Sequence, residues 1–359
     1  MREVIALDLM FMLSGCKIFT SSHAILVLNY IFLAAIVADY SYVMYILYVI
    51  VTRTQGFIIM SALCRLSEAV CGILFLFLMN QNRYDFRQVL PLFARNLTPK
   101  QKTSLSNHCI ITAFYILFAI GSEFAMTTIH LRHSREGQDM KTVRGNYVLA
   151  YQCMNQWFVG ASSFYCLCVK MIRMKEENYF DDLDERVEGM GGEVALELAV
   201  GRRKMRKDRK SLLKPFSFIP VLWFLYLFIK TTVLFIELLE RFGSLTERMW
   251  KTLPLVHQLL AVSFVVWQCD DCSHFSGRRS EPLVTRLMQG QHFQQMQPFV
   301  SELEKSRSRE FIVFDAFFIN RRFVLTYISS LITFSVLFLD VIYDYFFQRK
   351  PVITCDCIK

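Results

Sequence analysis

The chain has 359 residues, of which 54% are hydrophobic and 14% aromatic, and it carries a formal net charge of +9. The apolar residues are gathered into blocks of about 20 or more, a length that is typical of membrane-spanning helices. We therefore expect an all-α membrane protein, and this composition excludes an ordinary soluble enzyme or a nucleic-acid-binding domain.

Seven apolar blocks predict seven transmembrane helices. They lie at 23–51, 56–79, 109–130, 147–172, 215–240, 253–270 and 323–347. Residues 1–22 precede them and read as an amphipathic lead-in on the cytosolic face. The expected organisation is helices one to four within 23–172, a cytosolic loop at 173–214, helices five and six within 215–270, a cytosolic anchor at 271–322, helix seven at 323–347, and an external tail at 348–359.

The orientation follows from the positions of the basic residues. Lys and Arg are concentrated in the long connections at 80–108, 173–214 and 271–322. The positive-inside rule then places these connections and the N-terminus in the cytosol, and the C-terminus outside, as for a multi-pass protein of the plasma membrane. A G-protein-coupled receptor is an alternative with the same number of spans, but its N-terminus is external and its usual sequence signatures are missing.

The long cytosolic segments differ in character. Residues 173–200 are acidic and contain glycine, so we expect a mobile loop there. The basic run at 201–210 is interpreted as orienting charge beside the fifth span, in contact with anionic membrane lipids. Residues 281–322 are amphipathic at helical spacing, which predicts an anchor layer packed between subunits.

No catalytic or metal-binding motif stands out. Cys269, Cys272 and His274 have a zinc-like spacing, but one such pair beside a membrane helix is weak support for a metal site. We interpret the cysteines as free or lipidated thiols and expect no cofactor. The chain also lacks a Gly-rich phosphate loop and a recognisable nucleophile motif, so we do not expect an enzyme.

The last apolar block contains a stripe of residues at helical spacing that is polar except for one leucine, and we call it the polar stripe. Its members are Thr326, Ser330, Thr333, Leu337, Asp340 and Asp344. A charged residue at the centre of a membrane helix costs roughly 2.5–3.5 kcal/mol on insertion scales, so the stripe should face water or protein. Several copies around a symmetry axis could enclose a pore with such stripes. The alternative is packing against other helices through the Ser and Thr hydroxyls.

The same block resembles a known family. "FFINRRFVLTYISSLITFSVLFLDV" is similar to the C-terminal signature of the insect gustatory and odorant receptor superfamily, in which Thr-Tyr, five apolar residues and Gln-Phe follow an Ile-Asn-Arg-like turn. "MFMLSGCKIF" near the start is similar to the short element that precedes the family's first span. The resemblance extends to the layout of seven spans, a cytosolic N-terminus and three long cytosolic loops.

The signature can be aligned in two registers. One begins at Thr326-Tyr327, and the other begins at Thr333-Phe334 and ends at Asp340-Val341. We favour the second register because "INRR" then stands at the family's distance from the motif. In it, Phe replaces the family's Tyr, Asp replaces its Gln, and Val replaces its final Phe.

The resemblance implies a ligand-gated, non-selective cation channel of four subunits, of the gustatory type, that conducts Na⁺, K⁺ and Ca²⁺. By position, Leu337 falls at the family's hydrophobic gate and Asp340 at its pore glutamine, with Thr333 inside and Asp344 further out. A ring of carboxylates would attract cations and could bind permeant Ca²⁺. The assembly would be a homotetramer, or a heteromer with a related receptor. A transporter is the alternative, although it would more often show internal repeats.

Polar residues in the outer halves of spans three, four and six mark a candidate ligand site. They are Glu123, Thr127, Tyr151, Asn155, Gln156, Trp157, His257 and Gln258. In the resembling family these spans surround a pocket that opens outward, which would suit a small polar tastant. Hydrogen bonding between helices is the alternative role for each of these residues.

Overall fold

The computed structural model describes residues 97–133, 140–187, 192–216, 218–239, 245–289, 293–307, 312–313, 317–318 and 321–347, with isolated positions between 34 and 81. The predicted lead-in, the first two spans and the external tail at 348–359 therefore lie outside the described residues, apart from those isolated positions.

The described chain is helical except for one short hairpin. Its elements are α4 (Pro99–His133), α5 (Met140–Val187), α6 (Gly192–Leu213), the 3₁₀ turn η1 (Lys214–Phe216), α7 (Ile219–Leu239), α8 (Leu245–Gln289), α9 (Phe293–Arg307), β1 (Ile312–Val313), β2 (Phe317–Phe318) and α10 (Arg321–Phe347). The strands pair antiparallel, with Ile312 opposite Phe318, and lead directly into α10.

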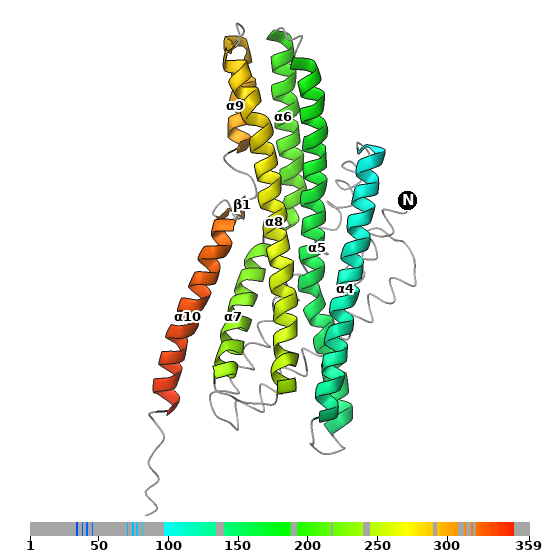
Figure 1. The fold of residues 1–359 in the computed structure, drawn as a ribbon, viewed down its shortest axis with the longest axis vertical. Helices are drawn as coiled ribbons and strands as arrows, with labels where there is room; N and C mark the ends of the chain where they lie inside the picture. The colour runs from blue at the N-terminus through cyan, green and yellow to red at the C-terminus, as the bar shows by residue number, and fades with distance from the viewer. Residues whose placement is uncertain are drawn as a thin grey trace, which may run out of the picture.

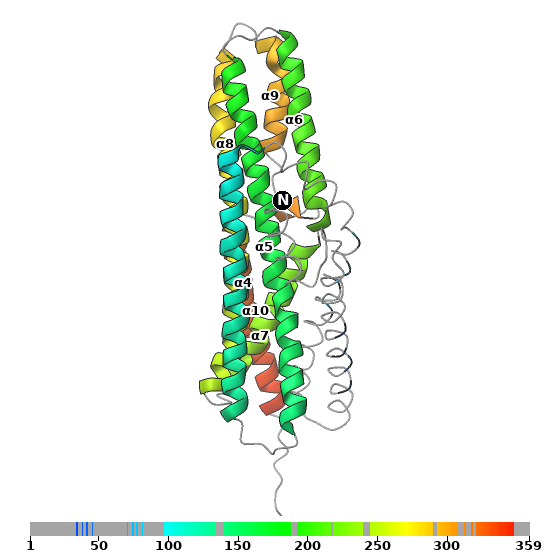
Figure 2. The same ribbon diagram turned by 90° about the vertical axis from the view of Figure 1, so that its right-hand side faces the viewer.

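Two long helices, α5 and α8, organise the fold. They contain 48 and 45 residues, which corresponds to about 70 Å of helix each at 1.5 Å per residue. At one end, α4, α7 and α10 flank them, and we call this part the main bundle. At the other end, α6 and α9 pack on them to form what we call the distal bundle (Figures 1 and 2).

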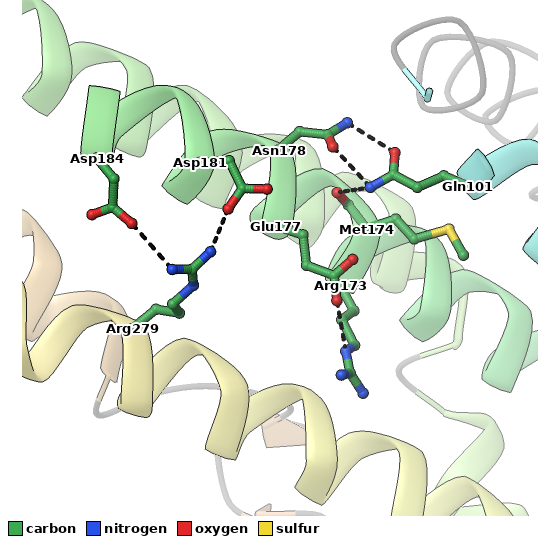
Figure 3. A network of polar contacts seen from close by, with 8 residues as sticks. All are labelled: Gln101, Arg173, Met174, Glu177, Asn178, Asp181, Asp184 and Arg279. Atoms are coloured by element: carbon green, nitrogen blue, oxygen red, sulfur yellow. Dashed lines mark hydrogen bonds and ion pairs between the residues drawn. The ribbon is translucent and has the colours of Figure 1, made fainter. Parts of the chain in front are cut away.

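The start of α4 is fixed by its sequence. Thr98 and Gln101 form a reciprocal capping box, in which the Gln101 amide donates to the Thr98 hydroxyl at 3.3 Å and the Thr98 amide donates to Oε1 of Gln101 at 3.1 Å. Pro99 stands at the first helical position, where its missing N–H costs nothing. The Gln101 side chain also exchanges hydrogen bonds with Asn178 on α5, so the cap joins two helices (Figure 3).

Each bundle has its own apolar core. In the main bundle, α5 and α7 contribute the largest buried side chains, and the ring of Phe158 lies 5.5 Å from that of Tyr226 and 6.0 Å from that of Trp223. The distal core draws on all four of its helices, with the buried residues Phe180, Leu183, Leu198, Ala199, Leu283, Phe299, Val300 and Leu303.

Arginines of α6 tie the distal bundle together. Arg202 and Arg209 lie 3.6 and 3.3 Å from Oε1 of the buried Glu176 on α5. Arg203 and Arg206 lie 3.4 and 3.2 Å from the carboxylate of Glu302 on α9. The basic run that we interpreted as orienting charge therefore also holds two carboxylates of neighbouring helices.

The mobile loop that we predicted at 173–200 was wrong, while the cytosolic placement of 173–214 stays a prediction. These residues are mostly helix, because α5 continues to Val187 and α6 begins at Gly192. The acidic side chains that suggested a solvated loop have basic partners, since Arg279 on α8 contacts both Asp181 and Asp184 (Figure 3). Similarly, α8 crosses the predicted boundary at 270 without a break.

The amphipathic segment before helix seven finds a partner within its own chain. α9 packs on α6 and α8 through Phe299, Val300 and Leu303. Its apolar face is therefore covered without a second subunit, which explains why the spacing of its apolar residues is helical.

Within the described residues, Pro99–Met126 is the one helical stretch that is long and apolar enough to cross a membrane. Its exposed side includes large apolar residues such as Ile111 and Phe114. Pro220–Thr232 and Arg322–Phe334 are apolar but shorter. The seven spans and their orientation remain predictions.

Candidate functional site

α10, the helix with the polar stripe, contacts α7 through aromatic side chains. The ring of Phe224 on α7 lies 4.7 Å from that of Phe323 and 4.8 Å from that of Tyr327. One turn of α7 further on, Phe228 lies 5.6 Å from Phe334. The Tyr327 hydroxyl also donates a 2.6 Å hydrogen bond to the Phe224 carbonyl. α10 is thus attached to α7 through these residues, and it also contacts α8.

The polar stripe lies beside this contact face and is exposed. Thr326, Ser330, Thr333 and Leu337 are all exposed in the single chain, and 56% of Leu337 is accessible. The hydroxyls of Thr326 and Thr333 donate to carbonyls four residues earlier, at 3.0 Å each. Such bonds satisfy the hydroxyl protons within the helix and leave the oxygens able to accept from water.

Asp340 and Asp344 continue the stripe in the last turns of α10. Their backbone is helical, while their side chains lie outside the described residues. Other sides of α10 expose large apolar residues, among them Leu325, Ile332 and Val336. A helix that exposes so much apolar surface requires lipid or another protein chain as its neighbour.

A second polar group joins α4 to α8 around His257. Nε2 of His257 lies 3.1 Å from the Ser122 hydroxyl, and Nδ1 lies 3.3 Å from the Tyr115 hydroxyl. The Ser122 hydroxyl also donates to the Ala119 carbonyl at 3.0 Å. The Tyr115 hydroxyl in turn donates to the His257 backbone carbonyl at 3.3 Å. Each of the two hydroxyls thus has a carbonyl acceptor in addition to its contact with the imidazole ring.

The neighbouring residue on α8, Gln258, faces α7 instead. Its Nε2 donates to the Tyr226 hydroxyl at 3.0 Å, and the Lys230 ammonium donates to the same oxygen at 2.9 Å. Lys230 also lies over the Tyr226 ring, 5.2 Å from its centre. All three side chains are buried, and burial of polar groups in a bundle is tolerated when they are hydrogen-bonded in this way.

The two predicted residues of span six therefore belong to two different contacts. Consecutive positions on a helix are about 100° apart, which lets His257 reach α4 while Gln258 reaches α7. Sequence reasoning missed Tyr115, Ser122 and Tyr226 as their partners. Lys230 was visible as a lone cation inside a strongly apolar block, a signal that could have been followed.

The remaining predicted ligand residues lie on α4 and α5, at Glu123, Thr127, Tyr151, Asn155, Gln156 and Trp157. Their side chains lie outside the described residues. Glu123 directly follows Ser122, and Trp157 directly precedes Phe158, which packs on Tyr226. The backbone thus brings these segments to the level of the two polar contacts.

The zinc-like spacing does not form a site. Cys269 and Cys272 are fully buried in the main core, whereas His274 is 65% exposed on its side chain and pairs with Asp270 at 3.7 Å. The two cysteines are free thiols. No group of three potential metal-binding side chains occurs among the residues that the structure describes.

Comparison with known proteins connects this fold to one group of receptors. No protein-family model matches the sequence, and no curated protein matches it either. Among solved structures, the insect olfactory receptor OR5 from Machilis hrabei matches with a TM-score of 0.72 at 10% identity, over 95% of this chain and 98% of that one. The same receptor in complex with eugenol matches equally well. The chain therefore has the fold of this insect olfactory receptor, in agreement with the superfamily that its C-terminal motif resembles.

Proposed function

We propose that this chain, which has the fold of an insect olfactory receptor, is a chemosensory receptor that acts as a ligand-gated, non-selective cation channel. The observation that carries the proposal is the exposed polar stripe of α10, which lies beside the face of the helix that packs on α7. A stripe of this kind needs water on one side, and a pore between subunits supplies it.

Four copies, each contributing α10, would surround the pore. Leu337 would form a hydrophobic constriction that closes by dewetting. Asp340 and Asp344, one and two turns further out, would form rings of carboxylates that attract Na⁺, K⁺ and Ca²⁺ and repel anions. The distal bundle would lie in the cytosol and help to hold the subunits together, in the plasma membrane with a cytosolic N-terminus.

The ligand would be a small polar molecule of the tastant type. The OR5 structure with eugenol is support for small-molecule binding in this fold. In this chain, the polar contacts around His257 and Gln258 lie between α4, α7 and α8, and ligand binding there would shift the packing of α7, to which α10 is attached. The gustatory assignment rests on the C-terminal motif.

Reconstitution tests the proposal. The purified protein in planar bilayers should give unitary current steps carried by cations, and a native mass measurement should give four copies. A screen with sugars, amino acids and eugenol, read out by cation flux from liposomes, should identify an activating class. A transporter would give flux without unitary steps, and that outcome would overturn the channel.

Two histidine variants locate the ligand site. His257→Ala should shift the activation curve of the compound found in the screen by about tenfold or more, since it removes two hydrogen-bonding positions from the site. His274→Ala is the matched control, because that side chain is exposed in the distal part of α8. Equal curves for both variants and the wild type would exclude this location.

A further inference from the structure

Tyr327 occupies a special place in the attachment of α10. Its hydroxyl donates a hydrogen bond to the Phe224 carbonyl of α7, at 2.6 Å. The aromatic contacts around it resist separation of the helices, but stacked rings are tolerant of sliding and rotation. A hydrogen bond is directional, so it fixes the rotation of α10 about its own axis.

Rotation of α10 decides where the polar stripe points. Tyr327 directly follows Thr326, a member of the stripe, and precedes Leu337 by ten residues. Each residue turns the helix by about 100°, so the stripe and the Tyr327 contact face are neighbouring sectors of one rigid cylinder. A small rotation at Tyr327 is therefore carried in full to Leu337.

We propose that Tyr327 is a positioning residue for the channel gate: its hydrogen bond to the α7 backbone holds α10 in the rotation at which Leu337 closes the pore. This inference rests on the proposed channel function. A dewetted constriction seals only when the apolar side chains of all subunits converge on the axis. A conducting pore does not require this convergence of the Leu337 side chains. Loss of the Tyr327 hydrogen bond should therefore favour the open state.

The same bond offers a route from the ligand site to the gate. Phe224, whose carbonyl accepts the bond, lies on α7 two residues before Tyr226, the partner of Gln258 and Lys230. A ligand that displaced Gln258 or Lys230 would shift this turn of α7 and, with it, the acceptor of the Tyr327 hydroxyl.

The test compares two Tyr→Phe variants in planar bilayers without added ligand. Tyr327→Phe keeps the ring and removes the hydroxyl. We expect its basal open probability to rise about fivefold, the factor for loss of one ordinary hydrogen bond, with unchanged unitary conductance. Phe323→Leu, which weakens the adjacent ring contact without touching the hydroxyl, should give a smaller rise.

Tyr179→Phe is the matched control. The Tyr179 hydroxyl donates to the Leu198 carbonyl at 3.2 Å in the distal bundle, far from α10 in the chain. Burial raises the pKa of Tyr179 to about 12, so this hydroxyl also stays protonated as a donor. The basal open probability of Tyr179→Phe should therefore equal that of the wild type.

The outcomes separate the inference from the channel proposal. A wild-type basal open probability in Tyr327→Phe, or an equal rise in Tyr179→Phe, overturns the positioning role while leaving the channel intact. A changed unitary conductance in Tyr327→Phe would also overturn it, because the hydroxyl would then act on the conducting pathway itself. Absence of unitary currents from the wild type, in protein of tetrameric native mass, overturns both.

Discussion

Arg209 donates a 3.3 Å hydrogen bond to Glu176, and both side chains are buried where α5 meets α6. Arg202 lies 3.6 Å from the same oxygen and donates a hydrogen bond to Ser276 on α8. One carboxylate thus balances two guanidinium groups in the interior of the distal bundle. This contact explains how a segment rich in charge folds into packed helices.

Glu176→Gln should destabilise the distal bundle strongly. It removes the negative charge between two buried guanidinium groups, and breaking a buried ion pair typically costs about 3–5 kcal/mol. Glu177→Gln is the control, since that carboxylate is about a third exposed and pairs with Arg173 on the surface, where a pair contributes about 0–1 kcal/mol. Thermal unfolding of the detergent-solubilised variants measures the difference, and equal melting temperatures would contradict this role of Glu176.

Gln101→Ala should loosen the first turn of α4. The substitution removes one arm of the capping box and the hydrogen bonds to Asn178 and the Met174 carbonyl (Figure 3). Loss of a cap costs about 0.5–2 kcal/mol. Hydrogen exchange at residues 101–104 should become faster, whereas Lys102→Ala, an exposed neighbour, should leave it unchanged. Unaltered exchange in Gln101→Ala would show that the cap is not needed.

Leu337→Ala should leave the pore partly open. A smaller side chain widens the constriction and weakens dewetting, so basal cation current should rise severalfold. Leu325→Ala is matched in chemistry and lies on another face of α10, where Leu325 is 68% exposed. Currents that rise equally in both variants would indicate general loosening of the helix rather than a gate.

Asn96 should carry no glycan. It begins the sequon Asn-Leu-Thr, which lies in a connection predicted to be cytosolic, and glycan is added only on the luminal side. Treatment of the protein from insect cells with a glycosidase should leave its mobility unchanged, while a glycosylation tag fused after Lys359 should shift it. Glycan at Asn96 would reverse the predicted orientation.

The polar stripe of α10 was predictable because it depends on helical spacing alone. Thr326, Ser330 and Thr333 share a face in any helix that contains them, whatever surrounds it. The attachment of α10 was not predictable, since Phe224 and Tyr327 lie 103 positions apart and nothing local marks them as partners.

The acidic segment after residue 173 was misread for a related reason. A run of acidic residues suggests a solvated loop when the sequence shows no basic partners nearby. In the structure, basic partners of this segment lie on α6 and α8. For example, Asp181 pairs with Arg279, which lies 98 positions later in the sequence. Likewise, His257 and Gln258 were predicted to line one site, but these adjacent residues contact different helices, α4 and α7.

The central claim is that α10 lines a cation-conducting pore, and Asp340 tests it most directly. Reversal potentials of single channels in planar bilayers, measured across a Ca²⁺ gradient, should shift in Asp340→Asn toward lower divalent permeability, because the substitution removes the charge of one carboxylate ring. Asp182→Asn, an exposed acid of the distal bundle, should match the wild type. A reversal potential unchanged by Asp340→Asn would contradict the placement of Asp340 in the pore.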